Sequence, residues 1–178
     1  MVSENIGPGE YSRELVKQAS SYFRMSGGIA LREFERSLDL IFQALSLNPG
    51  DRVLLSPLAP VEYYRRIVAN ELVPVFHDVN ETTASLGRDA AEYAVDAGAK
   101  AVVLDSPLGI VPALDAFIET NIPVIEDVTA SLGAFTEEHS SGSCGRFLVL
   151  RMEEDAIITA GGGTLVLARN NRALGDLR

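Results

Sequence analysis

The chain has 178 residues, of which 47% are hydrophobic and 22% are charged, and its formal net charge is −10. This composition is typical of a folded globular domain and excludes an intrinsically disordered chain. A strongly acidic surface repels phosphate groups, so we expect neither nucleic acid nor an anionic membrane surface as a partner. No apolar run reaches the roughly 20 residues that a transmembrane helix requires.

The N-terminal segment and the few cysteine and histidine residues argue against a secreted protein and a metal-binding protein. Residues 1–22 are polar and acidic, without a basic start followed by an apolar stretch, so we expect no secretory signal and a cytoplasmic location. Cys144 is the only cysteine, which excludes an internal disulfide and a cysteine-based zinc site. His77 and His139 are the only histidines, and we expect no metal site.

Two helices are predicted near the N-terminus, at 11–24 and 30–46. In the second, apolar residues recur at three- and four-residue steps and share one face, and Pro49 and Gly50 then end the helix. This apolar stripe is wider than one side of a sheet needs, so we expect part of it to lie exposed and to bind a partner. It consists of Ile29, Ala30, Leu31, Phe34, Leu38, Leu40, Ile41, Phe42, Ala44 and Leu45.

Short apolar runs follow that are rich in valine, leucine and isoleucine and mostly do not alternate with polar residues, as in strands buried on both faces. They are 52–56, 73–76, 100–105, 122–127, 147–151 and 163–168, and helix-length segments at 60–71, 87–97 and 112–120 lie between several of them. The alternation predicts one α/β domain over residues 1–178, with three α/β/α layers and a mixed, mainly parallel sheet.

Six segments match one family pattern in kind, order and approximate spacing. They are Leu38–Leu55, with a helix, a Pro-Gly-Asp turn and a strand, then Val73–Val79 (VPVFHDV), Ala99–Leu104 (AKAVVL), Ile122–Ala134 (IPVIEDVTASLGA), Gly142-Ser143 and the glycine run Gly161–Gly163. The pattern resembles the DegT/DnrJ/StrS family of pyridoxal-phosphate sugar aminotransferases. The resemblance covers roughly residues 25–178 and implies a fold-type-I large domain whose last strand runs antiparallel, with the family's small C-terminal domain absent.

An enzyme of this family needs a lysine for the Schiff base, a carboxylate for the pyridinium nitrogen, an aromatic ring that stacks on the cofactor and donors for its phosphate. The resemblance places the carboxylate at Asp127, at the end of a predicted strand, where the alternative is an aspartate that caps the following turn. The lysine position falls at about Asp155. The only lysines are Lys17 and Lys100, and a carboxylate cannot form a Schiff base.

The stacking ring and the phosphate loop also depart from the family pattern. Pro60 falls at the stacking position, and Tyr63 or Tyr64 could substitute, although we interpret both as ordinary residues of an amphipathic helix. Gly28–Leu38 resembles an early family helix, and the residues from Leu38 onward resemble the helix that follows the phosphate loop. We therefore predict that the strand and loop between them are deleted, which leaves one fused helix with no N-terminus directed at a phosphate.

From these observations we hypothesise that the chain is a degenerate aminotransferase-like domain. We expect it to carry no cofactor and to act as a non-catalytic binding or assembly subunit. Because the family's enzymes are dimers with shared sites, we expect a homodimer or a heteromer with an intact homologue. The alternative is that the chain takes part in pyridoxal-phosphate-dependent sugar-nucleotide aminotransfer by lending Asp127 or Arg151 to a partner's site. A third hypothesis is a different small-molecule site lined by Glu153, Glu154 and Asp155, which otherwise form a solvated acidic turn.

Overall fold

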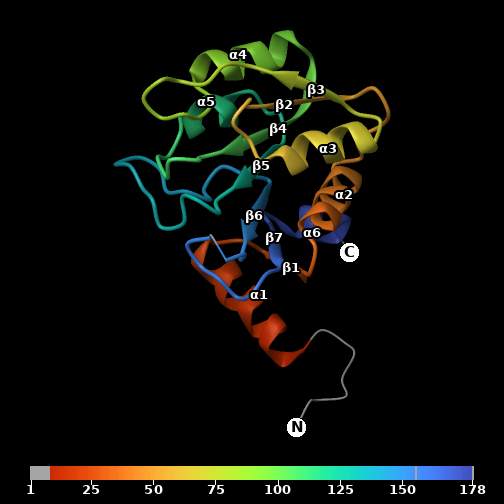
Figure 1. Ribbon diagram of the computed structural model, residues 1–178, viewed down its shortest axis with the longest axis vertical. Helices are drawn as coiled ribbons and strands as arrows, with labels where there is room; N and C mark the ends of the chain where they lie inside the picture. The colour runs from red at the N-terminus through yellow and green to blue at the C-terminus, as the bar shows by residue number, and fades with distance from the viewer. Residues whose placement is uncertain (1–8, 155, 178) are drawn as a thin grey trace.

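Seven strands form one mixed sheet in the order β1-β7-β6-β5-β4-β2-β3 (Figure 1). The computed structural model describes residues 9–154 and 156–177. The strands are β1 (Gly27–Leu31), β2 (Arg52–Leu55), β3 (Val73–Phe76), β4 (Ala99–Asp105), β5 (Val124–Asp127), β6 (Phe147–Arg151) and β7 (Thr164–Ala168). Strands β2 to β6 pair in parallel, whereas β7 is antiparallel to both β6 and β1. The mixed, mainly parallel sheet is therefore confirmed.

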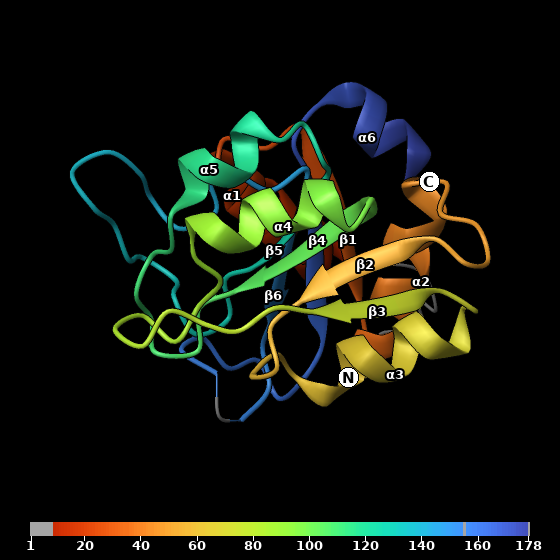
Figure 2. The same ribbon diagram turned by 90° about the horizontal axis from the view of Figure 1, so that it is seen from above.

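Helices cover both faces of this sheet, which confirms the three-layer α/β/α architecture (Figures 1 and 2). The helices are α1 (Glu10–Tyr22), α2 (Phe34–Ala44), α3 (Val61–Ala69), α4 (Arg88–Asp96), α5 (Leu114–Glu119) and α6 (Asn171–Asp176). Helices α2, α3 and α6 pack on one face, and α1, α4 and α5 pack on the other. Within the described ranges, no helix combines the length and the apolarity that crossing a membrane would take.

The central strands are apolar throughout because both of their faces are covered. On β4, Ala101 and Val103 point towards α2 and α3, whereas Val102 and Leu104 point towards α4 and α5, and each is at most 1% exposed. Successive side chains of a strand point to opposite faces. Asp105, the last residue of β4, therefore lies on the side of α2 and α3. All six predicted strands are confirmed to within two residues of their observed bounds.

The start of the predicted helix at 30–46 is wrong, because Gly27–Leu31 forms strand β1 and α2 begins only at Phe34. The close approach of a neighbouring strand explains the glycine at position 28 of β1. A Cβ atom on Gly28 would lie 2.2 Å from the carbonyl oxygen of Val166 on the neighbouring strand β7. The predicted deletion and fused helix are therefore wrong as well, and a strand and a turn precede the N-terminus of α2.

The expectation that part of the apolar stripe on this helix lies exposed is also wrong. Phe34, Leu38, Ile41 and Phe42 are each at most 5% exposed and belong to the core beneath α2 and α3. Among the described residues, the large apolar side chains that lie exposed come from other elements. The width of the stripe reflects contact with the sheet, α3 and α6 together rather than a surface left for a partner.

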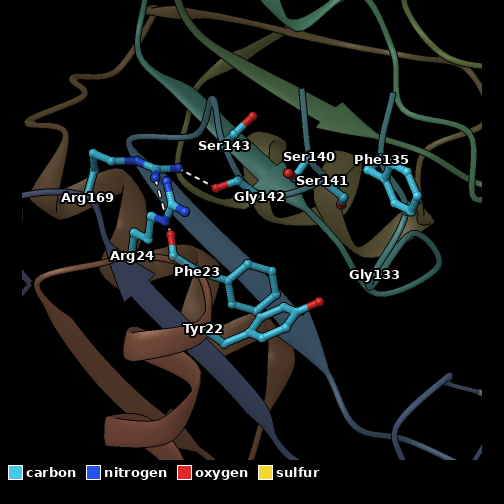
Figure 3. Close-up of a pocket in the computed structure, with 11 residues that line it drawn as sticks. Tyr22, Phe23, Arg24, Gly133, Phe135, Ser140, Ser141, Gly142, Ser143 and Arg169 are labelled. Carbon is cyan, nitrogen blue, oxygen red and sulfur yellow. Dashed lines mark hydrogen bonds between the residues drawn. The ribbon is translucent and has the colours of Figure 1, made fainter. Parts of the chain in front are cut away.

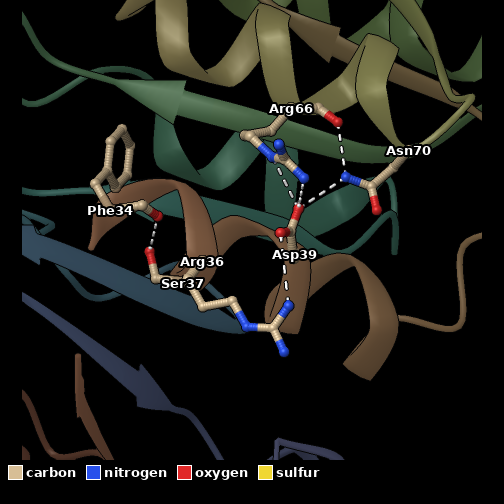
Figure 4. A network of polar contacts seen from close by, with 6 residues as sticks. All are labelled: Phe34, Arg36, Ser37, Asp39, Arg66 and Asn70. Atoms are coloured by element: carbon tan, nitrogen blue, oxygen red, sulfur yellow. Dashed lines mark hydrogen bonds and ion pairs between the residues drawn. The ribbon is translucent and has the colours of Figure 1, made fainter. Parts of the chain in front are cut away.

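A polar cluster joins α2 to α3 (Figure 4). Nε and Nη2 of Arg66 on α3 donate to Oδ1 of Asp39 on α2, at 2.9 and 2.6 Å, and Nδ2 of Asn70 donates to the same oxygen at 2.9 Å. Arg36 lies 4.0 Å from the second carboxylate oxygen. Charge-assisted hydrogen bonds of this kind fix orientation as well as contributing energy. They hold α3 in place against α2.

Candidate functional site

Three charged side chains meet at the carboxyl edge of the parallel strands. Asp105 ends β4, Asp127 ends β5, and the two are register partners in the sheet. Arg151 ends β6, the next strand along. The carboxyl edge of an open α/β sheet is where such folds place their ligands. The predicted position of Asp127 at a strand's carboxyl end is confirmed.

Both oxygens of Asp127 are engaged within the chain. The hydroxyl of Tyr63 donates to Oδ2 at 3.0 Å, and the backbone N–H of Thr129 donates to Oδ1 at 2.9 Å. Nε of Arg151 lies 3.6 Å from Oδ2 and completes an ion pair. Burial, followed by the charge of Asp127, raises the pKa of Tyr63 well above its usual value, so the phenol stays protonated and donates.

An aromatic pair packs beside this carboxylate. The ring of Phe34 meets the ring of Tyr63 edge to face, with centroids 5.2 Å apart, and the guanidinium of Arg151 lies 5.0 Å above the Phe34 centroid. The backbone N–H of Arg151 also donates to the Thr129 hydroxyl at 3.0 Å. The structure separates the two tyrosines considered from the sequence, since Tyr63 is fully buried at the site and Tyr64 is 44% exposed.

A cavity of about 230 Å³ opens next to these groups. Its lining consists of Leu58, Pro60, Asp105, Ser106, Pro107, Asp127, Thr129, Ala130 and Arg151. Asp105 is 5% exposed, and neither of its oxygens has a hydrogen-bond partner among the described residues. Burial, followed by the charge of Asp127, raises the pKa of Asp105 to about 7. Sequence reasoning missed this residue, although it ends a predicted strand as Asp127 does.

The N-terminus of α2 carries two exposed acidic side chains. Glu33 is the N-cap residue, in an extended conformation and without a side-chain capping hydrogen bond, and Glu35 lies in the first turn. Carboxylates at this end of a helix interact favourably with its dipole. They also oppose the approach of a phosphate to the same end.

The acidic segment after β6 is only partly described. Asp155 lies outside the described residues, and Glu153 and Glu154 are exposed. Glu153 lines a second hollow of about 210 Å³, which shares Thr129 and Arg151 with the first cavity. In the described part of the chain, no group of three or more histidine, cysteine, aspartate or glutamate side chains is arranged to hold a metal ion.

A buried glutamate on the opposite face of the sheet holds the loop that enters β6. Glu126 is 4% exposed, and its carboxylate accepts backbone N–H bonds from Gly142, Cys144 and Gly145 at 2.6, 3.0 and 2.7 Å. Arg169 donates to backbone carbonyls of the same loop. The adjoining hollow of about 550 Å³ is drawn in Figure 3. Because the guanidinium of Arg169 is committed to carbonyls, we interpret this region as a structural junction.

Comparisons with known proteins agree with this architecture. The model of the DegT/DnrJ/EryC1/StrS aminotransferase family matches residues 1–176. L-glutamine:2-deoxy-scyllo-inosose aminotransferase of Streptomyces kanamyceticus is 29% identical over 161 residues, which cover 88% of this chain and 38% of the relative.

Solved structures show the same fold. An aminotransferase from Psychrobacter cryohalolentis superposes with a TM-score of 0.88 at 24% identity, covering 97% of this chain and 45% of that one. NtdA from Bacillus subtilis, solved with bound cofactor PMP, has a TM-score of 0.83 at 20% identity, covering 95% and 39%. The chain therefore spans less than half of the length of each of these three proteins.

Proposed function

This chain belongs to the DegT/DnrJ/EryC1/StrS aminotransferase family, and on that premise we propose that it is a degenerate member that carries no pyridoxal phosphate. In this proposal it serves as a non-catalytic binding or assembly subunit. The observation that carries the proposal is that Asp127, the position that matches the family's pyridinium-binding carboxylate, already accepts hydrogen bonds from Tyr63 and Thr129 and forms an ion pair with Arg151. When bound, pyridoxal phosphate supplies an electron sink for amino-group transfer, and the residues at this edge do not fit it.

The lysine pattern supports the proposal. The chain has lysines only at positions 17 and 100. Lys100 is exposed near the amino end of β4, whereas Asp105 and the site lie at the carboxyl end of that strand. Lys17 belongs to α1, which packs on the face of the sheet opposite Asp127. Neither lysine is placed to form a Schiff base beside Asp127.

The N-terminus of α2 also supports the proposal that the chain carries no pyridoxal phosphate. A helix N-terminus favours an anion through its unpaired N–H groups and its dipole. Here Glu33 and Glu35 already supply negative charge at that end, and Phe34 turns inward to pack between Tyr63 and Arg151. A phosphate would meet two carboxylates, which repel it.

The lending of residues to a partner's active site is less well supported by these contacts. Asp127 is 4% exposed and is held by three groups of its own chain. Arg151 is committed to Asp127 and to the face of Phe34. Releasing either side chain would leave a buried charge without its partner, which costs several kcal/mol.

An apolar surface on α3 and β3 supports a role in assembly. Tyr64 and Phe76 are 44% and 45% exposed, with ring centroids 6.2 Å apart, and Val68 beside them on α3 is 48% exposed. Strand β3 is an edge of the sheet, and exposed edges with apolar side chains readily pair with another chain. We propose that this surface forms the contact of a homodimer or of a heteromer with an intact homologue.

Light scattering at micromolar concentration tests the assembly role. The Phe76→Glu variant is expected to shift an associated form towards monomer, because it places a charge in the apolar contact. A Val95→Glu variant, at a 54% exposed position on α4, is the matched control and is expected to associate normally. A monomer at every concentration, with no intact homologue bound, would overturn the role in assembly.

Reductive trapping tests the cofactor proposal. After incubation with pyridoxal phosphate and borohydride, peptide mapping is expected to find no adduct at the edge around Asp127, and visible absorbance of an internal aldimine is expected to be absent. Adducts at the surface lysines serve as an internal check on the reagent. The Asp155→Lys variant restores the family's residue, and we expect it to gain no transaminase turnover because Asp127 stays occupied. Turnover by the unmodified chain with a stoichiometric adduct at this edge would overturn the proposal.

A further inference from the structure

One buried charge at the carboxyl edge has no partner in the described chain. Both oxygens of Asp105 have under 1 Å² of accessible surface and no hydrogen-bond partner, and the residue lines the cavity of about 230 Å³. The large majority of buried side-chain polar atoms in folded proteins do have a partner. An unpartnered carboxylate that borders a cavity therefore indicates a donor that the chain itself does not supply.

The charged side chains next to Asp105 do not supply this hydrogen-bond donor. Asp127 on β5 is compensated by Tyr63 on α3 and by Arg151 on β6. Arg151 lies over Phe34, and its Nε is 3.6 Å from Asp127 without a hydrogen bond. When both aspartates are ionised, two negative charges therefore face one positive charge, and the uncompensated charge is that of Asp105.

We propose that this cavity binds the ammonium group of a small primary amine, with Asp105 as its counter-ion. The inference rests on the proposed function, because it needs the same edge of the sheet to be free of pyridoxal phosphate. Because both Asp105 oxygens are inaccessible without a ligand, the side chain would first rotate towards the cavity and then accept from the ammonium. A short alkyl chain would contact the apolar part of the lining, formed by Leu58, Pro60 and Pro107.

The chemistry of the lining separates an amine from other occupants. A metal ion would require more ligands than the described residues offer. An anion would add charge to a site that is already negative. A neutral alcohol could donate a hydrogen bond but would leave the charge of Asp105 uncompensated. The net charge of −10 on the chain also raises the local concentration of cations.

Binding of a cation should be linked to the release of a proton. The groups that face Asp105 are Asp127, Arg151 and Tyr63, and Glu153 lines the adjoining hollow. Without a ligand, Asp105 takes up its proton near pH 7. Because the ammonium ion prefers the ionised carboxylate, affinity should rise about tenfold per pH unit below pH 7 and level off above it.

Calorimetric and NMR titration of the full chain with n-butylammonium chloride tests the inference. We expect saturable binding with a dissociation constant of order millimolar for so small a ligand, and a proton released at pH 6. The matched probes 1-butanol and pentanoate, which carry no positive charge, are expected to bind at least tenfold more weakly. The Asp105→Asn variant is expected to lose both the binding and its pH dependence, and Glu153→Gln is expected to keep them.

Three results would overturn the inference: no saturation by butylammonium at pH 8, equal binding of 1-butanol, or loss of binding in Glu153→Gln with retention in Asp105→Asn. The last result would assign the amine to the acidic segment instead. Reductive trapping distinguishes this failure from failure of the proposed function. Absence of both amine binding and a cofactor adduct overturns the amine site alone, whereas a stoichiometric cofactor adduct at this edge overturns the proposed function.

Discussion

The phenol hydroxyl of Tyr63 on α3 lies 3.0 Å from Oδ2 of Asp127 at the end of β5, and neither side chain is more than 4% exposed. The polar cluster of Asp39, Arg66 and Asn70 holds α3 against α2, and this fixes the position from which Tyr63 reaches the sheet. The contact between α2 and α3 thus determines which side chain donates a hydrogen bond to Asp127.

Removing this hydroxyl should destabilise the domain. In Tyr63→Phe the ring still packs against Phe34, but Oδ2 of Asp127 loses its hydrogen-bond donor in a buried position. We expect a loss of about 1–3 kcal/mol in the free energy of unfolding, measured by urea denaturation. Tyr64→Phe, at the exposed neighbouring position, is the control and should change stability by less than about 0.5 kcal/mol. Equal stability of Tyr63→Phe and the unmodified protein would mean that the bond contributes nothing.

Asp105 should make stability depend on pH. Its pKa is about 7 in the folded protein, against 3.8 for an aspartate in an unfolded chain. The folded state therefore binds the extra proton between these values, so the contribution of Asp105 to stability is fully present below about pH 4 and is lost as the pH rises to 7. This loss amounts to about 4 kcal/mol.

The Asp105→Asn variant should remove this dependence. Relative to the unmodified protein, the variant should become more stable as the pH rises from 4 to 7, as measured by urea denaturation at each pH. Glu153→Gln, which removes an exposed carboxyl, should follow the unmodified profile. A constant difference between Asp105→Asn and the unmodified protein over this range would contradict the assignment.

Glu126 should stabilise the conformation of the loop that enters β6. Glu126→Gln keeps the size of the side chain but replaces a carboxylate that accepts three backbone N–H bonds with a neutral amide. We expect unfolding free energy to fall by at least about 2 kcal/mol, since hydrogen bonds to charged groups are the stronger ones. Hydrogen exchange at the amides of Gly142, Cys144 and Gly145 should accelerate. Unchanged protection at these amides would show that the carboxylate does not hold the loop.

Cys144 should react very slowly in the folded protein. Burial, followed by the charge of Glu126, raises the pKa of its thiol to about 12. Because only the thiolate is nucleophilic, alkylation by iodoacetamide at pH 8 should be at least about a thousandfold slower than in the urea-unfolded chain. A single cysteine makes the measurement unambiguous. Comparable rates in the folded and unfolded states would contradict the burial of this thiol.

The sheet could be predicted from the sequence because its strands are nearly continuous apolar runs, and Asp127 could be placed because it ends one of them. Strand β1 could not, since Ile29 and Leu31 also fit the three- and four-residue spacing of the helix that follows. The distinguishing signal is the pair Gly27-Gly28, of which Gly28 is required by the close approach of β7 and Gly27 lies against the side chain of Leu174 on α6. The short helix α6 was missed too, although Asn170 caps it by accepting from the backbone N–H of Ala173.

The site was predicted only where one residue matched a family position. The roles of Tyr63 and Phe34 depend on the packing of α2 against α3, which apolar periodicity does not specify. Asp105 lies one residue beyond the matched segment Ala99–Leu104, and its importance follows from missing contacts, which become visible only once the surrounding side chains are placed.

The groups that engage the carboxylate of Asp127 at the edge of the sheet all come from the chain itself. A protein that binds a coenzyme only in its native state gains stability as the coenzyme becomes more abundant. Under the function that we propose, Tyr63 and Arg151 engage Asp127 in place of a coenzyme, and the domain gains no stability from coenzyme binding. Its abundance in the cell should therefore not follow the supply of vitamin B6, whereas that of a coenzyme-dependent relative should.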